Sequence, residues 1–200
     1  MKSTKPFSQS SEENKTVILE QLMVLYANSD CVLEIGSGTG QHAVHFARHL
    51  SHLRWQPTEL AENVAGVNIW VEDAGLDNIE APLVLDVAQQ HWGLTADYDA
   101  VFSANTLHIM SILHVEKLFA GLGKLLNKDA LFCCYGPFNK DGRFSSESNA
   151  RFDHWLKQRD EASGIRDMSE LTVFAEKAGF VLQEDIEMPV NNRILVWKMS

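Results

Sequence analysis

Three acidic residues, Glu34, Glu59 and Asp86, have the chemistry and the spacing of a ligand-binding site. Each lies at or near the end of a segment that we expect to form a strand: "CVLEI", which reads as fully buried, "LRWQPTE" or "APLVLDV". In an open parallel sheet, ligands bind beyond the carboxyl ends of the strands. Three carboxylates at that edge would accept hydrogen bonds from the hydroxyl and amino groups of one ligand.

A turn rich in glycine follows the first of these strands. The sequence "GSGTG" places glycine at positions 36, 38 and 40. Glycine adopts positive φ without strain and lets a ligand approach the backbone closely. The helix that we expect over residues 41–50 would direct free N–H groups toward the same place, which favours an anionic group there.

The kind of ligand follows from what the turn lacks. A dinucleotide site has a third glycine where this chain has Gln41, and the sequence contains no P-loop motif. Glu34 would repel a pyrophosphate, but it would attract the ammonium of a zwitterion such as the methionine end of S-adenosylmethionine. In this interpretation Glu59 binds a ribose diol and Asp86 binds an adenine amino group.

Four features, "LEIGSGTG", Glu59, "LDV" and "YDAVFSANTLHIM", resemble the successive cofactor motifs of class I S-adenosylmethionine-dependent methyltransferases. The resemblance covers residues 14–198. It is closer still to a small, poorly characterised methyltransferase-like family of bacteria and animals, through "WQP", "GPF", "GIRD" and "NN..LVW". It implies a Rossmann-like α/β fold with S-adenosylmethionine as the cofactor. The cofactor-binding residues that we predict are Glu34, Gly36, Ser37, Gly38, Gly40, Glu59, Asp86, Val87 and Asn105.

The chain departs from that family at two places. Leu60 stands where the family often has an acidic residue, so the predicted ribose contact depends on Glu59. The family's "RDP.WGIRD" is "RDEASGIRD" here, over residues 159–167. We expect the charged residues of this segment to pair with one another and to shape a lid; the alternative is a solvated charged loop.

The methyl acceptor is expected near the ends of the fourth and fifth strands. His108 is the first candidate for a general base, because imidazole titrates near neutrality; the alternative is that it packs at the start of a helix and contacts only the cofactor. Asp153 is the second catalytic candidate, with a capping or surface role as its alternative. The predicted acceptor-binding residues are Tyr135, Phe138, Asn149, Arg166 and Asn192. Tyr135 and Phe138 would flank the sulfonium or belong to the core, and Asn192 would bind the acceptor or satisfy a hairpin turn.

Four histidines, His42, His45, His49 and His52, recur at helical spacing. Such spacing can bind a metal, but no cysteine or carboxylate nearby in the sequence completes a site. We therefore expect no physiological metal.

The order of the predicted elements defines the fold class. Strands alternate with helices until "FVLQEDIEM" and "RILVWKM", which the turn "PVNN" joins as an antiparallel hairpin. We expect a doubly wound, mostly parallel, seven-stranded sheet with a C-terminal antiparallel strand. The first helix would begin with a capping box of Ser10 and Glu13. Residues 1–200 would then form one domain, with a polar arm over residues 1–11.

Composition limits the partners. The 200 residues are 45% hydrophobic and carry a formal net charge of −10, which disfavours nucleic acids and anionic membranes. The three cysteines suit a reducing compartment, and neither a signal peptide nor a membrane span is evident, so we expect a cytoplasmic protein.

The sequence thus favours a methyltransferase that acts on a small molecule or a protein side chain. The motif that methylases of nucleic-acid amino groups place after the fourth strand is replaced by "SANT". The first alternative is a non-catalytic protein that binds S-adenosylmethionine or a partner. A nucleotide-dependent oxidoreductase is disfavoured by Gln41 and by the lack of a Tyr-x-x-x-Lys pair.

Overall fold

A computed structural model describes residues 5–94 and 97–200. Its strands form a seven-stranded sheet in the order β3-β2-β1-β4-β5-β9-β8, with an additional two-stranded pairing of β6 and β7. The predicted fold class is confirmed. The contacts within the chain group it into two compact units. The N-terminal unit comprises the chain up to Asp86 with Tyr98–Phe102, and the C-terminal unit comprises Val87–Asp97 and Ser103–Ser200.

The parallel strands of the N-terminal unit bring their carboxyl ends to one edge. β1 (Cys31–Ile35) pairs with β2 (Arg54–Glu59) and with β4 (Ala100–Ala104), and β2 pairs with β3 (Leu83–Val84). Of the expected third strand, "APLVLDV", only Leu83 and Val84 pair with β2. Pro82 has no N–H to give to a ladder, which limits pairing at this edge of the sheet.

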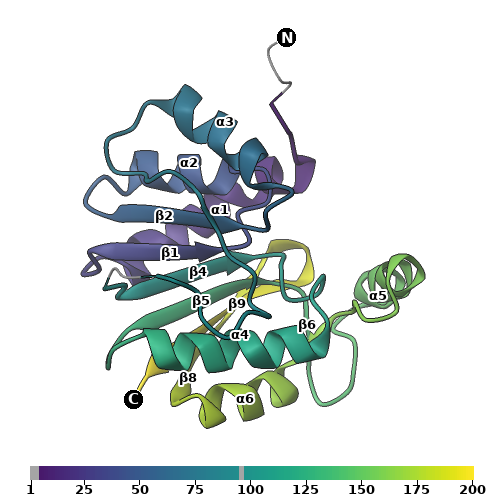
Figure 1. Ribbon diagram of the computed structural model, residues 1–200. Coiled ribbons are helices and arrows are strands. Elements are labelled where there is room, and N and C mark those ends of the chain that lie inside the picture. Colours follow the sequence, from purple (N-terminus) through teal and green to yellow (C-terminus); the bar gives the residue numbers. More distant parts are fainter. Residues whose placement is uncertain (1–4, 95–96) are drawn as a thin grey trace. The chain divides into compact units, whose positions relative to one another are not determined.

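Three helices accompany these strands in the N-terminal unit. They are α1 (Gln9–Leu25), α2 (Gln41–His49) and α3 (Val64–Ala74), and α2 contacts both of the others (Figure 1). α2 packs the ring of Phe46 against Trp55 of β2 and Phe102 of β4, with centroid distances of 5.6 and 5.2 Å. This aromatic cluster is the centre of the unit's core and fixes α2 on the sheet.

The first helix begins earlier than expected. Ser8 is its N-cap: it has extended backbone angles, and its Oγ accepts from the N–H of Ser11 at 3.2 Å. The predicted capping box of Ser10 and Glu13 is wrong, because both residues already lie inside the helix. Of the predicted polar arm, residues 1–4 lie outside the described part of the chain.

In the C-terminal unit, β9 (Asn192–Met199) runs antiparallel to both β5 (Leu131–Gly136) and β8 (Phe180–Met188). The short 3₁₀ turn Pro189–Asn191 joins β8 to β9, so the expected hairpin is confirmed. α4 (Ile112–Leu125) and α6 (Met168–Lys177) lie side by side along this part of the sheet (Figure 1). Phe119 of α4 packs edge-on against Trp197 of β9 at 5.2 Å.

A small feature of the C-terminal unit was not predicted. β6 (Phe138–Asn139) pairs in parallel with β7 (Arg166–Asp167), and this ladder brings the "GPF" and "GIRD" segments together. α5 (Glu147–Arg159) lies between them in the sequence.

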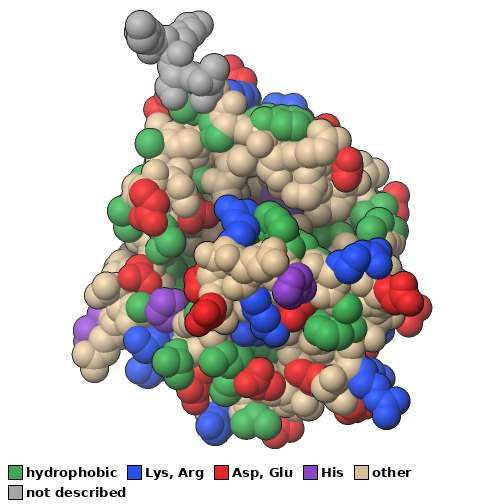
Figure 2. Space-filling view, turned by 90° about the vertical axis from the view of Figure 1, so that its right-hand side faces the viewer, with side chains coloured by type: hydrophobic (Ala, Val, Ile, Leu, Met, Phe, Trp, Pro, Cys, Tyr) green, Lys and Arg blue, Asp and Glu red, His purple; other side chains and the backbone are tan. Residues whose placement is uncertain are grey.

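One face of the molecule carries mixed charge. On the face that Figure 2 shows, acidic, basic and hydrophobic side chains are interspersed, without a large patch of one sign. None of the helices within residues 5–94 and 97–200 is both long and apolar enough to cross a membrane.

Candidate functional site

The glycine turn between β1 and α2 is left-handed at each glycine. Gly36, Gly38 and Gly40 have φ values of 71°, 59° and 91°. The N–H of Ser37 donates to the carbonyl of Thr58 on β2 at 2.9 Å, which ties the turn to the neighbouring strand. A Cβ placed on Gly38 would meet no atom within 4 Å, whereas one on Gly40 would lie 3.1 Å from Val67 Cα. The backbone is therefore open to a ligand at Gly38 and packed against α3 at Gly40.

Glu34 is buried directly beneath this turn and is only 2% exposed. Its Oε2 accepts from Ser37 Oγ at 2.8 Å and from Trp55 Nε1 at 3.1 Å. Burial raises the pKa of the Glu34 carboxyl to about 7, although both hydrogen bonds favour the ionised form; the charge of Glu59 raises it further. Glu34 is thus close to half-ionised at neutral pH and would gain from a cationic ligand.

Glu59 meets the same turn from the end of β2. Its Oε2 accepts from the N–H of Gly38 at 2.7 Å, and its Oε1 accepts from the N–H of Leu60 at 2.8 Å. Each carboxylate oxygen can accept more than one hydrogen bond. The structure therefore bonds Glu34 to Ser37 and Glu59 to Gly38, so that both carboxylates hold adjacent residues of one turn.

Asp86 follows the end of β3. Val84 pairs in register with Glu59, and the N–H of Leu85 donates to the Glu59 carbonyl at 2.9 Å. Glu34 is thus the fourth residue of β1, Glu59 is the last residue of β2, and Asp86 lies two residues beyond β3.

The predicted residues of the C-terminal unit form a second group. Asn105 has a φ of 56°, and its N–H donates to the Tyr135 carbonyl at 2.9 Å. A Cβ on Gly136 would lie 3.8 Å from Asn105 Oδ1 and 3.9 Å from His108 Nδ1, so these two side chains approach the end of β5 together. Val87, also in this unit, is buried.

His108 is 7% exposed, and its ring packs edge-on against Phe152 of α5 at 5.2 Å. Burial lowers the pKa of His108 to about 4, and the positive charge of Arg166 lowers it further. The imidazole is therefore neutral across the physiological pH range.

Asp153 and Arg166 hold the chain around residues 162–166 in place. Asp153 Oδ1 accepts from the N–H of Ile165 at 2.8 Å, and its Oδ2 accepts from Lys157 Nζ at 2.7 Å. Arg166 Nε donates to the Leu107 carbonyl at 3.1 Å. Its Nη2 donates to the Ala162 carbonyl at 2.8 Å and to the Met110 carbonyl. Both side chains thus make hydrogen bonds to other residues of the protein.

The remaining predicted acceptor residues lie nearby in the fold. Tyr135 and Phe138 are both buried, at the end of β5 and in β6. Asn149 of α5 is buried and donates to the Asn191 carbonyl at 3.2 Å, so it ties α5 to the β8–β9 turn. Asn192 Nδ2 donates to the Pro189 carbonyl at 3.3 Å, which is the turn-satisfying role considered from the sequence.

Two residues that support Glu34 were not singled out from the sequence. Trp55 donates to its carboxylate, and Thr58 Oγ1 donates to its backbone carbonyl at 2.6 Å. The strand register contains a signal for Trp55: it pairs with Val32, which shares a sheet face with Glu34. That signal needs the β1–β2 register, which one sequence does not supply.

The histidines of α2 have different bonding partners, although the rings of His45 and His49 lie 4.5 Å apart. His42 Nε2 bonds to Asn14 Oδ1 at 2.7 Å, and His49 Nδ1 lies 2.8 Å from the His45 carbonyl. Within the part of the chain that the structure describes, His, Cys, Asp and Glu side chains form no group of three or more that could hold a metal.

Three solved structures of methyltransferases have folds similar to that of this chain. An O-methyltransferase family protein from Burkholderia thailandensis matches with a TM-score of 0.84 and 13% identity over 96% of this chain and 57% of that chain. The methyltransferase SibL in its apo form gives 0.80 and 19% identity, with 95% and 55% covered. Human N-acetylserotonin methyltransferase in complex with SAM gives 0.78 and 12%, with 96% and 53% covered.

These likenesses define the class of the fold, which is that of class I S-adenosylmethionine-dependent methyltransferases. This chain spans little more than half the length of those proteins. It belongs to the family described as "Protein of unknown function (DUF938)", whose family model matches residues 5–199.

Proposed function

We propose that the protein is an S-adenosylmethionine-dependent methyltransferase that acts on a small molecule or a protein side chain. One observation carries the proposal. The carboxylates of Glu34 and Glu59 are buried at the ends of neighbouring parallel strands and are joined through one glycine turn, by bonds to Ser37 and Gly38. A buried pair of acidic groups beside an open backbone fits a ligand that carries both a cation and hydroxyl groups.

The residues of the N-terminal unit fit the cofactor part by part. Glu34, with its raised pKa, would pair with the ammonium of the methionine end. The positive end of α2 would favour its carboxylate. Glu59 would accept from the ribose hydroxyls and Asp86 from the adenine amino group, with Gly38 allowing close approach. When bound, S-adenosylmethionine supplies an electrophilic methyl group on a sulfonium.

The C-terminal unit would supply acceptor recognition. A neutral His108 can accept a hydrogen bond from an acceptor O–H or N–H and hold the nucleophile in line. A pKa of about 4 makes His108 a weak base for an alcohol. We therefore assign it the role of orienting the acceptor rather than that of removing its proton. Val87 and Asn105 are proposed cofactor contacts, and Tyr135, Phe138, Asn149, Arg166 and Asn192 are proposed to shape the acceptor site.

Calorimetry with S-adenosylhomocysteine, S-adenosylmethionine and NAD tests the cofactor assignment. We expect binding of the first two and none of NAD. Glu59→Ala should weaken binding by at least about tenfold, the loss of one charge-assisted bond or more. The exposed Glu62→Ala is the control. Binding of NAD alone, or an unchanged affinity of Glu59→Ala, would contradict the assignment.

A non-catalytic cofactor-binding protein is the second candidate. It is favoured by the internal engagement of Asp153 and Arg166, which leaves His108 as the remaining candidate for chemistry. Release of S-adenosylhomocysteine from S-adenosylmethionine, screened across metabolite and peptide pools, separates the two. Turnover supports the enzyme, and binding without turnover in all pools supports the second candidate.

A further inference from the structure

The chain before α1 is anchored on α3. The Trp70 Nε1–H donates to the Pro6 carbonyl at 2.7 Å. Lys5 Nζ lies 2.5 Å from Asp73 Oδ2 and 3.8 Å from the centre of the Trp70 ring. The Pro6 ring is so close to Gly66 that a Cβ there would lie 3.0 Å from Pro6 Cγ. Residues 5–8, which we call the N-terminal strap, thus follow the surface of α3.

The same tryptophan also contacts the glycine turn. A Cβ on Gly40 would lie 3.2 Å from Trp70 Cβ and 3.1 Å from Val67 Cα. Trp70 therefore packs against the turn with the base of its side chain and binds the strap with its indole N–H. A shift of α3 at Trp70 would therefore move its contacts with both the strap and the glycine turn.

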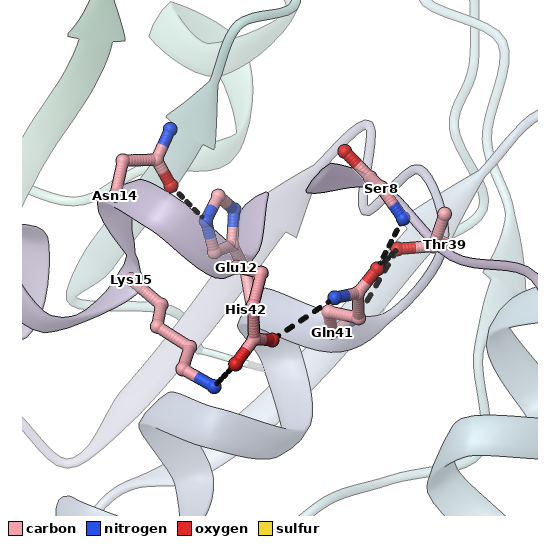
Figure 3. A network of polar contacts seen from close by, with 7 residues as sticks. All are labelled: Ser8, Glu12, Asn14, Lys15, Thr39, Gln41 and His42. Atoms are coloured by element: carbon pink, nitrogen blue, oxygen red, sulfur yellow. Dashed lines mark hydrogen bonds and ion pairs between the residues drawn. The ribbon is translucent and has the colours of Figure 1, made fainter. Parts of the chain in front are cut away.

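Gln41 makes the second link between strap and turn, as Figure 3 shows. Its side chain is buried, and its Oε1 accepts from the N–H of Ser8 at 2.6 Å and from Thr39 Oγ1 at 3.0 Å. Its Nε2 donates to Glu12 Oε2 at 3.3 Å. One amide thus joins the end of the strap, the first turn of α1 and the glycine turn.

The anchors of the strap differ in strength. The Ser8–Gln41 bond involves a buried amide, whereas the Asp73 side chain of the Lys5 ion pair is 70% exposed. Exposed ion pairs contribute little to stability. Phe7, within the strap, is 60% exposed. The strap is therefore held mainly at Gln41 and Trp70, the two residues that also contact the turn.

We propose that the N-terminal strap is a closing element of the cofactor site, and that Gln41 is a positioning residue through which strap docking and cofactor binding reinforce each other. The inference rests on the proposed function, because the ligand of the turn is taken to be S-adenosylmethionine. A ligand that fixes Thr39 and the glycine turn fixes the partner of Gln41, and so favours the docked strap. By linkage, the docked strap raises affinity for the ligand by the same factor.

Hydrogen exchange tests the coupling. Amide exchange over residues 5–12 would be measured with and without S-adenosylhomocysteine, in the full chain. We expect the ligand to slow exchange of the Ser8 amide by about tenfold, within the usual range of coupling between sites. Gln41→Met keeps the side-chain length but removes the amide. In this variant, amides of residues 5–12 should exchange faster than in wild type without ligand, and S-adenosylhomocysteine should bind about tenfold more weakly.

Gln56→Met is the matched control. Gln56 is also buried, and its amide donates to the carbonyls of Pro57 and Ala81 rather than to the strap. It should leave exchange over residues 5–12 unchanged. Trp70→Phe provides an independent variant: it removes the N–H that binds Pro6 and keeps the Cβ that lies near Gly40. It should loosen the strap as Gln41→Met does.

The outcomes separate the inference from the function on which it rests. If wild type binds S-adenosylhomocysteine but strap exchange does not change, the coupling is wrong and the cofactor assignment stands. If wild type does not bind at all, the proposed function fails and the coupling fails with it. Equal affinities of Gln41→Met and Gln56→Met would also overturn the role of Gln41.

Discussion

At the scale of single residues, two of the three glycines in the turn require glycine for different reasons. Gly38 and Gly40 both have positive φ, but only Gly40 is packed against other atoms. We expect Gly38→Ala to lower the free energy of unfolding by about 1–2 kcal/mol, because alanine is strained in a left-handed backbone. It should also weaken S-adenosylhomocysteine binding by at least about tenfold, because the added methyl group fills the open space at Gly38. Gly40→Ala should cost about 3 kcal/mol or more, since the clash with Val67 adds to the strain.

Gly75 supplies the control for this pair of substitutions. It has a φ of 57° and nothing within 4 Å of an added Cβ, as at Gly38, but it ends α3. Denaturant titration should show similar losses of stability for Gly75→Ala and Gly38→Ala, while calorimetry finds weakened binding only for Gly38→Ala. Equal affinities of the two variants would show that the ligand does not approach at Gly38.

We predict that the ionised Glu34 carboxylate lowers the stability of the fold and strengthens ligand binding. Its folded pKa, about 7, is above the ordinary value of 4.5, so its protonated form stabilises the fold below pH 4.5 and this contribution is lost as the pH rises through 7. Glu34→Gln keeps an oxygen for Ser37 and Trp55 and removes the buried charge. We expect it to be more stable than wild type by on the order of 2 kcal/mol at pH 8, and no more stable at pH 4.

The same substitution should weaken S-adenosylhomocysteine binding at pH 8 by at least about tenfold, because a neutral amide attracts an ammonium less than a carboxylate does. Denaturant titrations at the two pH values and calorimetry at pH 8 measure both effects. Unchanged affinity, or the same stability difference at both pH values, contradicts the role of Glu34.

At the scale of elements, Asp153 connects α5 to the chain before β7. Its Oδ1 accepts from the buried Ile165 N–H, so removing the oxygen leaves that donor unpaired. We expect Asp153→Ala to lose about 1–3 kcal/mol of stability and Asp153→Asn, which keeps an acceptor, to lose less. If Asp153 instead removes a proton from the acceptor, Asp153→Asn will abolish turnover while stability and Ile165 amide exchange stay close to wild type.

The sequence predicts the elements whose signal is local. β1 is apolar except for Glu34, β5 is a continuous apolar run, and the β8–β9 hairpin has its turn marked by "PVNN", so all of these are found where expected. The β6–β7 ladder has two pairs of residues and no periodicity, so nothing local marks it. The bond between Asn149 and the Asn191 carbonyl joins positions 42 apart in the sequence, and only the fold reveals it.

The candidate site divides in the same way. That the acidic residues at the strand ends share one edge of the sheet follows from the alternation of strands and helices, because parallel strands bring their carboxyl ends to one edge. The partners that set their properties do not: Trp55 reaches Glu34 across a strand register, and Gln41 reaches Ser8 across 33 positions. A pattern can thus indicate which residues share one edge of the sheet, whereas the residues that position them depend on packing.

At the scale of the whole molecule, buried histidines should set the acid limit of stability. His42 in the N-terminal unit and His108 in the C-terminal unit are 6% and 7% exposed, and burial lowers the pKa of each to about 4. The ordinary value is 6.5, so as the pH falls the unfolded chain takes up protons first. The stability that the neutral rings contribute is present above pH 6.5 and is lost as the pH falls through 4.

Each ring accounts for on the order of 3 kcal/mol over this range, a large share of the 5–15 kcal/mol typical of a folded protein. Glu34 opposes them between about pH 4.5 and 7, because its contribution grows as the pH falls. We therefore expect the unfolding free energy to fall between pH 6.5 and 4.5, more steeply in Glu34→Gln and less steeply in His42→Gln or His108→Gln. The exposed His114→Gln should follow wild type. Denaturant titrations at pH 7, 6 and 5 measure these slopes, and an equal slope in wild type and both buried-histidine variants would show that the two imidazoles do not stay neutral in the fold.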